Sequence, residues 1–218
     1  MPRFDLVAGS AFIVHNAPTP NPSAFAEVIR LPSVQSTLRI ANISTLVYET
    51  NEWNLQGFRQ YWHVVTIKAN ATLFDRIFDI FLEEVEALKN VKDILPSYVL
   101  QPMKHIMSVS SHKNGGNSVG MVEDADGPLV MLSASPIWSK KEDDELVIGA
   151  FNRFFTRAEE LAKEMGAWHP FLYQNYADGS QDVFRGYKEG NREKLRAIKK
   201  AYDPAGVLER LQPGYFNV

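Results

Sequence analysis

Two long stretches of the chain place apolar side chains every three or four residues. The first runs from Ala71 to Asn90 and the second from about Glu142 to Met165. This spacing is typical of helices with one buried face, so we expect two amphipathic helices there. The expected capping boxes at their starts are Thr72 with Asp75 and Ser139 with Glu142.

Strands are expected where side chains alternate between two faces with a period of two residues. The segment Gln60–Lys68 is rich in β-branched and aromatic residues and is apolar at both parities, which predicts a central strand buried on both faces. A third, shorter helix is expected over Asn191–Tyr202. Further strands are expected at 3–14, Ser97–Met103, Ser118–Val122 and Pro128–Ile137.

The order of these elements indicates the fold class. Strands and helices do not alternate as βαβ units throughout, and no glycine-rich phosphate-binding pattern occurs. We therefore expect an α+β fold, in which an antiparallel sheet is covered by helices on one face. Residues 1–218 are expected to form a single domain.

Composition excludes several classes of function. The 23 Lys and Arg residues against 26 Asp and Glu residues give a net charge of −3, and no basic patch offers a track for phosphates, so a nucleic-acid partner is not expected. There is no cysteine, which excludes disulfides and thiolate chemistry. No apolar run is long enough to span a membrane, and the start lacks a secretory pattern, so a cytoplasmic protein is expected.

Among ionisable residues, His63 is the first candidate for a catalytic role. It lies in the middle of the expected central strand, where partial burial would shift its pKa and allow acid–base chemistry near neutral pH. The alternative is a hydrogen-bonded core histidine. The five histidines show no metal-binding spacing, so no metal is expected.

Polar and aromatic residues on apolar strands suggest a binding pocket. Gln101, Asn117 and Ser133 have the character of hydrogen-bonding groups placed in an apolar cavity. Tyr61 and Tyr98 could form aromatic walls, although aromatic residues on strands are more often part of the core.

The C-terminal region carries the most specific pattern. Its Y-x-N-Y-x-D segment starts at Tyr173 and includes Asn175, Tyr176 and Asp178, and a Tyr-Asp-Pro-x-Gly-Val turn follows at 202–207. This resembles the C-terminal, substrate-domain half of fungal FAD-linked oxidases of the berberine-bridge type, within the vanillyl-alcohol-oxidase superfamily. The resemblance implies the same α+β fold, with Tyr173, Asn175 and Tyr176 at the border of the substrate pocket. The alternative is that these residues close the core and hold the last helix. As a hydrogen-bonding group at that border, Tyr173 is a second candidate catalytic residue.

The resemblance does not extend to the flavin-binding domain, whose pyrophosphate loop and flavin-attachment residues have no counterpart here. The family's catalytic glutamate aligns with Gly120. We therefore expect no cofactor, the alternative being FAD supplied by another chain.

Three functions remain open. The first is a flavin-independent enzyme derived from such an oxidase, which catalyses a cyclisation, isomerisation or pericyclic step on a small apolar secondary metabolite. The second is a fragment or split subunit of an FAD-dependent oxidoreductase, and the third is a non-catalytic ligand-binding module. A homodimer is expected, because loss of the flavin domain would expose apolar surface.

Overall fold

The computed structural model describes residues 7–52, 54–103, 116–119, 127–212, 216 and 218. They fall into two compact units, Phe4–Gly57 and Phe58–Val218. Each unit is described by itself, and the single domain expected from the sequence stays a prediction.

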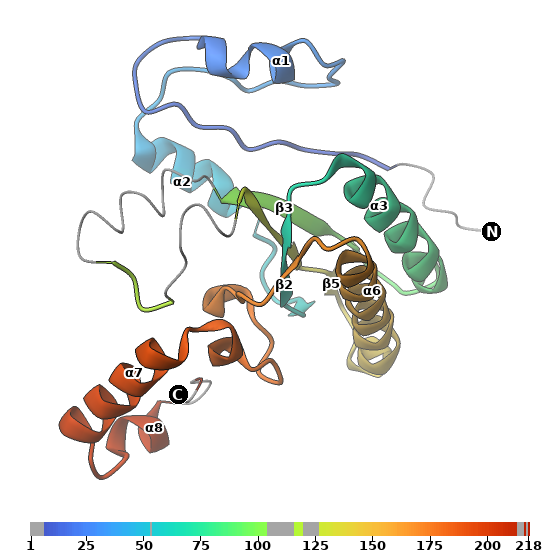
Figure 1. Ribbon diagram of the computed structural model, residues 1–218. Helices are drawn as coiled ribbons and strands as arrows, with labels where there is room; N and C mark the ends of the chain where they lie inside the picture. Colours follow the sequence, from blue (N-terminus) through green and yellow to red (C-terminus); the bar gives the residue numbers. More distant parts are fainter. Residues whose placement is uncertain (1–6, 53, 104–115, 120–126, 213–215, 217) are drawn as a thin grey trace. The chain divides into compact units, whose positions relative to one another are not determined.

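The larger unit is built on a four-stranded sheet in the order β3-β4-β2-β6, with every neighbouring pair antiparallel (Figure 1). A two-stranded ribbon of β1 and β5 adjoins it. The bounds are Arg59–Gln60 (β1), His63–Lys68 (β2), Tyr98–Met103 (β3), Leu129–Ala134 (β4), Ile137–Trp138 (β5) and Trp168–His169 (β6).

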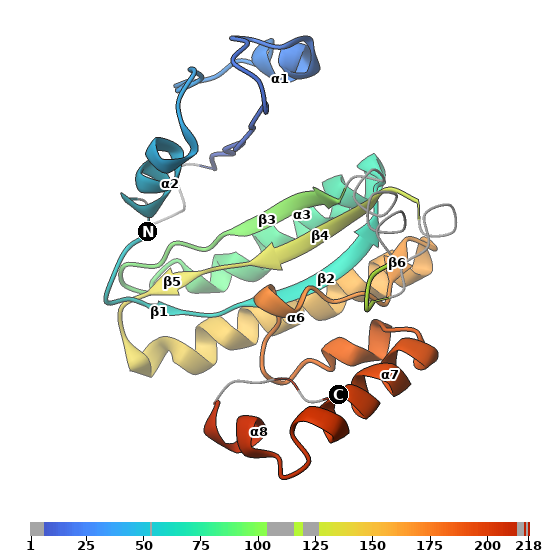
Figure 2. The same ribbon diagram turned by 90° about the vertical axis from the view of Figure 1, so that its left-hand side faces the viewer.

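Two helices cover one face of this sheet. Figure 2 shows α3 (Ala71–Val85) behind β3 and β4, and α6 (Asp144–Glu164) behind β2. Their buried stripes include Leu73, Ile77, Val147 and Phe151. The predicted α+β class, with helices on one face of an antiparallel sheet, is confirmed.

Both helices begin differently from the prediction. The side chain of Asn70 caps α3 by accepting a hydrogen bond from the Leu73 amide at 3.0 Å, so the expected box at Thr72 is wrong. Asn70 has the extended backbone of an N-cap residue, whereas Thr72 already lies inside the helix. A short 3-10 helix, η3 (Lys141–Asp143), precedes α6, and the Ser139 hydroxyl donates to the Lys92 carbonyl instead of capping the helix.

The C-terminal tail consists of short helices. The predicted third helix is present as α7, and the Asp203 carboxylate accepts hydrogen bonds from the Val207 and Leu208 amides at 2.6 and 3.0 Å. Asp203 thereby caps the start of α8, a helix the sequence reading missed. The bounds are η2 (Glu86–Leu88, after α3), η4 (Gln174–Tyr176), η5 (Val183–Gly186), α7 (Glu189–Tyr202) and α8 (Val207–Leu211).

The N-terminal unit contains η1 (Ser23–Phe25), α1 (Ala26–Ile29) and α2 (Ile43–Glu52). Residues 7–14 form no strand, so the predicted strand at 3–14 is wrong for its described part, and 3–6 lie outside the described residues. The predicted strand Ser118–Val122 is likewise absent at 118 and 119, and its remainder is not described. Across the described ranges, no helix is long and apolar enough to cross a membrane.

Candidate functional site

The register of the four-stranded sheet assigns each strand residue to one of two faces. Directly paired residues of neighbouring strands share a face, and successive residues alternate. We call the face that carries His63, Leu132 and Tyr98 the helix face, because α3 and α6 pack on it. The opposite one is the tail face, which carries Val64, Thr66, Lys68, Leu129, Met131, Ser133, Val99, Gln101 and Met103.

His63 lies on the helix face. Its ring packs against Phe155 of α6 with centroids 4.4 Å apart, and its Nδ1 lies 3.0 Å from the hydroxyl of Tyr61. That hydroxyl in turn donates to Oδ1 of Asn152 at 2.6 Å. Burial lowers the pKa of His63 to about 4, against the opposing effect of Asp178 and Glu159. The imidazole is therefore neutral near pH 7.

Tyr61 and Tyr98 also belong to the helix face. Burial, with a smaller effect of Asp178, raises the pKa of Tyr61 to about 12. The ring of Tyr98 contacts Phe81 at 4.8 Å and Phe154 at 5.7 Å, within the aromatic core. Both predicted aromatic walls thus pack between sheet and helices.

The tail face is partly covered by the C-terminal tail. Val64 and Met131 pack against Phe171, Leu172 and Val183, and all five are buried. This small cluster is the second core of the unit. It places the Y-x-N-Y-x-D segment directly over the sheet.

Three aromatic side chains, Trp62, Tyr173 and Tyr176, contact one another beside this cluster, and we call them the aromatic border. The indole of Trp62 stacks on Tyr176, with centroids 5.1 Å apart and planes inclined by 24°. Tyr173 meets Tyr176 edge to face at 4.9 Å, and its hydroxyl accepts a hydrogen bond from Asn175 Nδ2 at 3.0 Å. The three predicted residues of the segment are thus brought together with Trp62, whereas His63 lies on the other face.

Gln181 fastens the tail to the sheet. Its Nε2 donates to the Val64 carbonyl at 2.8 Å, and its Oε1 accepts from the amides of Val64 at 3.2 Å and Asp178 at 3.0 Å. Strand β6 pairs with β2 at Thr66 and Ile67. The side chain of Gln181 takes the place of a further strand residue by bonding to the backbone of Val64. The sequence reading missed this role, because a glutamine in a loop carries no signal of it.

Beside the aromatic border, part of the tail face remains open. Val99 is 46% and Trp62 38% exposed, and Gln101 is exposed as well. Ser97 and Ser135 extend the same face and lie within 3.5 Å of each other through their hydroxyls. We call these five residues the open strip.

Two buried hydroxyls lie on the tail face: Ser133 is paired with Val99 of the open strip, and Thr66 lies on β2, beyond Met131. Ser133 is 1% exposed and Thr66 is fully buried. The Oγ1 of Thr66 has no hydrogen-bond partner among the described residues. A buried hydroxyl without a partner is unfavourable in free energy.

Asn117, predicted to line the pocket, contacts helix α7. It is half-buried, and its carbonyl accepts a hydrogen bond from Asn191 Nδ2 of α7 at 3.2 Å. Its described contact therefore links a loop to the tail.

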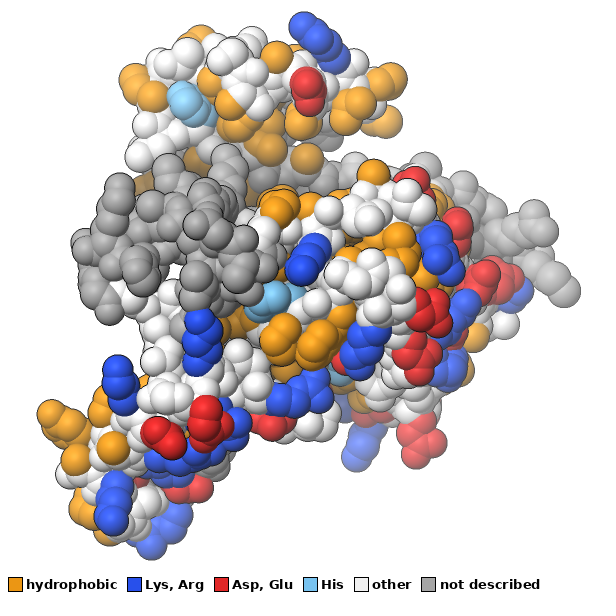
Figure 3. Space-filling model, viewed as in Figure 1, with side chains coloured by type: hydrophobic (Ala, Val, Ile, Leu, Met, Phe, Trp, Pro, Cys, Tyr) orange, Lys and Arg blue, Asp and Glu red, His pale blue; other side chains and the backbone are white. Residues whose placement is uncertain are grey.

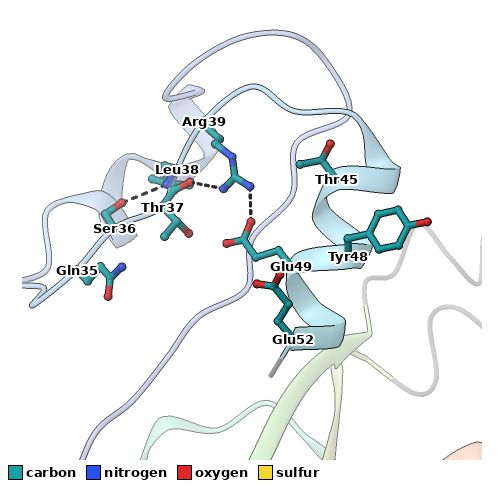
Figure 4. Close-up of a pocket in the computed structure, with 9 residues that line it drawn as sticks. All are labelled: Gln35, Ser36, Thr37, Leu38, Arg39, Thr45, Tyr48, Glu49 and Glu52. Carbon is teal, nitrogen blue, oxygen red and sulfur yellow. Dashed lines mark hydrogen bonds and ion pairs between the residues drawn. The ribbon is translucent and has the colours of Figure 1, made fainter. Parts of the chain in front are cut away.

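Other surface features do not gather into a site. In the N-terminal unit, segment 35–39 and α2 border a shallow depression of about 820 Å³, where Arg39 pairs with Glu49 (Figure 4). None of the described residues of that unit is buried, so nothing fixes its side chains around a ligand. Over α3 and α6, acidic and basic side chains alternate (Figure 3), as in the pairs of Glu84 with Arg153 and Arg157. The described part of the chain contains no cluster of three potential metal ligands.

Comparison with known proteins places the chain near flavoenzymes. No protein-family profile matches it, and no solved structure does. It is 33% identical to the FAD-dependent monooxygenase tpcD of Cochliobolus heterostrophus, over 86% of this chain and 37% of that protein. It is 33% identical to the FAD-dependent monooxygenase FUP4 of Fusarium proliferatum, over 87% of this chain and 37% of that one. It is 32% identical to the FAD-dependent monooxygenase drtC of Aspergillus calidoustus, over 92% of this chain and 38% of that protein.

The chain thus resembles fungal FAD-dependent monooxygenases along nearly all its length, and spans less than half of theirs. Flavin binding needs donors or positive charges for the pyrophosphate. In such sites the pyrophosphate lies on backbone amides of a glycine-rich turn at a helix N-terminus, or on Lys or Arg. The open strip and aromatic border contain serine, glutamine and aromatic residues, but no Gly, Lys or Arg. These residues fit the edge of a planar ring and do not fit a pyrophosphate grip.

Proposed function

We propose that the chain is the substrate-holding portion of an FAD-dependent oxidoreductase. A planar, mostly apolar substrate would lie on the open strip, against Trp62 and Tyr176. The similarity to three FAD-dependent monooxygenases supports the reaction class. The flavin would be held by protein beyond the residues described, because the strip does not fit a pyrophosphate.

The observation that carries the substrate site is the aromatic border beside a partly solvated sheet face. Trp62 keeps 38% of its surface exposed although it stacks on Tyr176. Ligand sites are mostly apolar with a few placed polar groups. Gln101, Ser97 and Ser135 are the polar groups of the strip, and they can hydrogen-bond the carbonyl or hydroxyl groups of a phenolic substrate.

A second candidate is the cofactor-free enzyme of the first sequence hypothesis. The strip brings hydrogen-bonding groups beside an aromatic border, while His63 lies on the other face of the sheet. This arrangement favours a cyclisation, isomerisation or pericyclic step on a secondary metabolite, because such steps need orientation more than proton transfer. Holding a near-attack geometry can lower a unimolecular barrier by several kcal/mol.

Binding of a planar phenol tests the site that both candidates share. We would titrate the purified chain with 1,8-dihydroxyanthraquinone by calorimetry and compare Trp62→Leu with wild type. Loss of one aromatic contact of about 1 kcal/mol should weaken binding roughly five- to tenfold.

Trp168→Leu is the matched control. Trp168 is paired with Ile67, so its side chain lies on the helix face, where it packs with Lys163. The control should bind as wild type does. Equal binding by wild type and Trp62→Leu, or no saturable binding at all, would refute the assignment of the open strip.

A further inference from the structure

Among the strands that the structure describes, β3 lies at one edge of the sheet, and its hydrogen bonds show which of its amides face outward. The Ser135 amide donates to the Ser97 carbonyl at 3.3 Å, and Leu95 and Ile137 exchange both bonds at 2.9 and 3.2 Å. In an antiparallel ladder a residue directs its N–H and C=O to the same side, and successive residues alternate. Odd-numbered residues from 95 to 103 therefore bond to the neighbouring strand.

Even-numbered residues direct their backbone groups away from the sheet. Pro96 and Pro102 both fall at even positions, where a missing N–H costs no bond within the sheet. Between them, the N–H groups of Tyr98 and Leu100 face outward. Within the described ranges, no strand pairs with this side of β3.

Helix α3 carries an apolar stripe on the same side of the molecule. Phe78 is 37% and Leu82 36% exposed, and half-buried Phe74 continues the stripe at a spacing of four residues. The other flank of α3 faces α6, as the ion pairs of Glu84 with α6 show. Figure 2 shows α6 behind β2 and α3 behind β3 and β4. The flank of α3 opposite to α6, which carries the stripe, is therefore the one toward the outer edge of β3.

We propose that this open edge and the α3 stripe together bind a second copy of the chain about a twofold axis through Leu100. The axis pairs β3 with its mate in antiparallel fashion, so the two sheets become one. Each Leu100 amide then donates to the other Leu100 carbonyl, and each Tyr98 amide donates to the carbonyl of Pro102 in the other copy.

A single twofold rotation of a second copy pairs the outward-facing backbone groups of β3 and also covers the apolar stripe of α3. The twofold axis is perpendicular to the joined sheet, so the two α3 helices lie on the same face with their stripes toward each other. Paired strands are about 4.8 Å apart. A helix centred under β3 and β4 would then lie roughly 10 Å from its mate, close to the usual packing distance of two helices.

The chemistry of the surface agrees with self-association. Neither the strand Tyr98–Met103 nor the three stripe residues carry a charge, so the paired surfaces themselves contain no like charges. The open strips of both copies end on the same face of the joined sheet and stay accessible.

The mass of the chain in solution tests the pairing. Light scattering at about 50 μM should give twice the 24.7 kDa chain mass for the wild type. The double variant Phe78→Lys with Leu82→Lys should raise the dimer dissociation constant by roughly a hundredfold. The control is Ile198→Lys with Leu208→Lys, two exposed apolar residues of α7 and α8, which should remain dimeric.

Amide hydrogen exchange shows whether β3 is the paired element. In the dimer, the amides of Tyr98 and Leu100 should be protected along with those of Val99 and Gln101, which bond within the sheet. In the double variant, only Val99 and Gln101 should stay protected. A monomeric wild type, a dimer with fast-exchanging Tyr98 and Leu100, or dissociation of the control variant would each overturn the proposal.

Discussion

Replacing Gln181 tests how the tail is held over the sheet. In Gln181→Ala, the amide and carbonyl of Val64 and the amide of Asp178 all lose their partner. Val64 is fully buried, so water replaces these bonds poorly. With a net value of about 1 kcal/mol for each hydrogen bond, the free energy of unfolding should fall by roughly 2–3 kcal/mol.

The assay is urea unfolding at pH 7, followed by the near-ultraviolet circular dichroism of the stacked Trp62–Tyr176 pair. The tail should detach at a lower urea concentration than in wild type, and the signal of the stack should fall even without urea. Gln174→Ala is the matched control, because Gln174 lies in the same tail segment and its side chain makes no hydrogen bond to the described residues. A change below about 0.5 kcal/mol in Gln181→Ala, or an equal loss in the control, would show that the tail is held in another way.

Three further predictions concern stability. The pKa of His63 is about 4 in the folded protein, and its ordinary value is 6.5. As the pH falls, the unfolded chain therefore binds a proton before the folded protein does. The free energy of unfolding should fall by roughly 1–3 kcal/mol between pH 6.5 and pH 4. His63→Asn should lack that part of the loss in urea titrations, whereas a variant of the exposed His15, His15→Asn, should keep it. Asn70→Ala should cost about 1 kcal/mol of unfolding free energy through loss of the α3 cap, and Thr72→Ala should cost less. Asp203→Ala should lower helical circular dichroism by releasing the start of α8; an unchanged spectrum would contradict its capping role.

Periodicity predicted the elements that form the core of the larger unit. The segments that became β2, β4, α3 and α6 bury one or two apolar faces, and such burial leaves a repeat in the sequence. Strand β3 is only half-buried on the face of Tyr98 and Leu100. The repeat disappears where little is buried. Helices α2 and α8 have no buried residue and were not predicted. Helix α7 has none either, but the Asp203-Pro204 pair that follows it marked its end in the sequence.

The candidate site was predictable only in part. The resemblance at Tyr173 and Tyr176 led to the aromatic border, and the polar residues on apolar strands led to Gln101 and Ser133. Whether a strand residue faces the helices or the tail depends on register and packing partners, which one sequence does not contain. The alternation of a strand does put His63 and Trp62 on opposite faces, but which of the two faces meets the helices could not be predicted.

The central claim is that the chain holds the substrate and does not grip the flavin by itself. The most direct measurement is the flavin content of the purified chain, from its visible spectrum and from the supernatant after denaturation, before and after incubation with FAD. The account predicts a colourless protein that retains well below one FAD per chain in both cases. Stoichiometric FAD that survives gel filtration would contradict it.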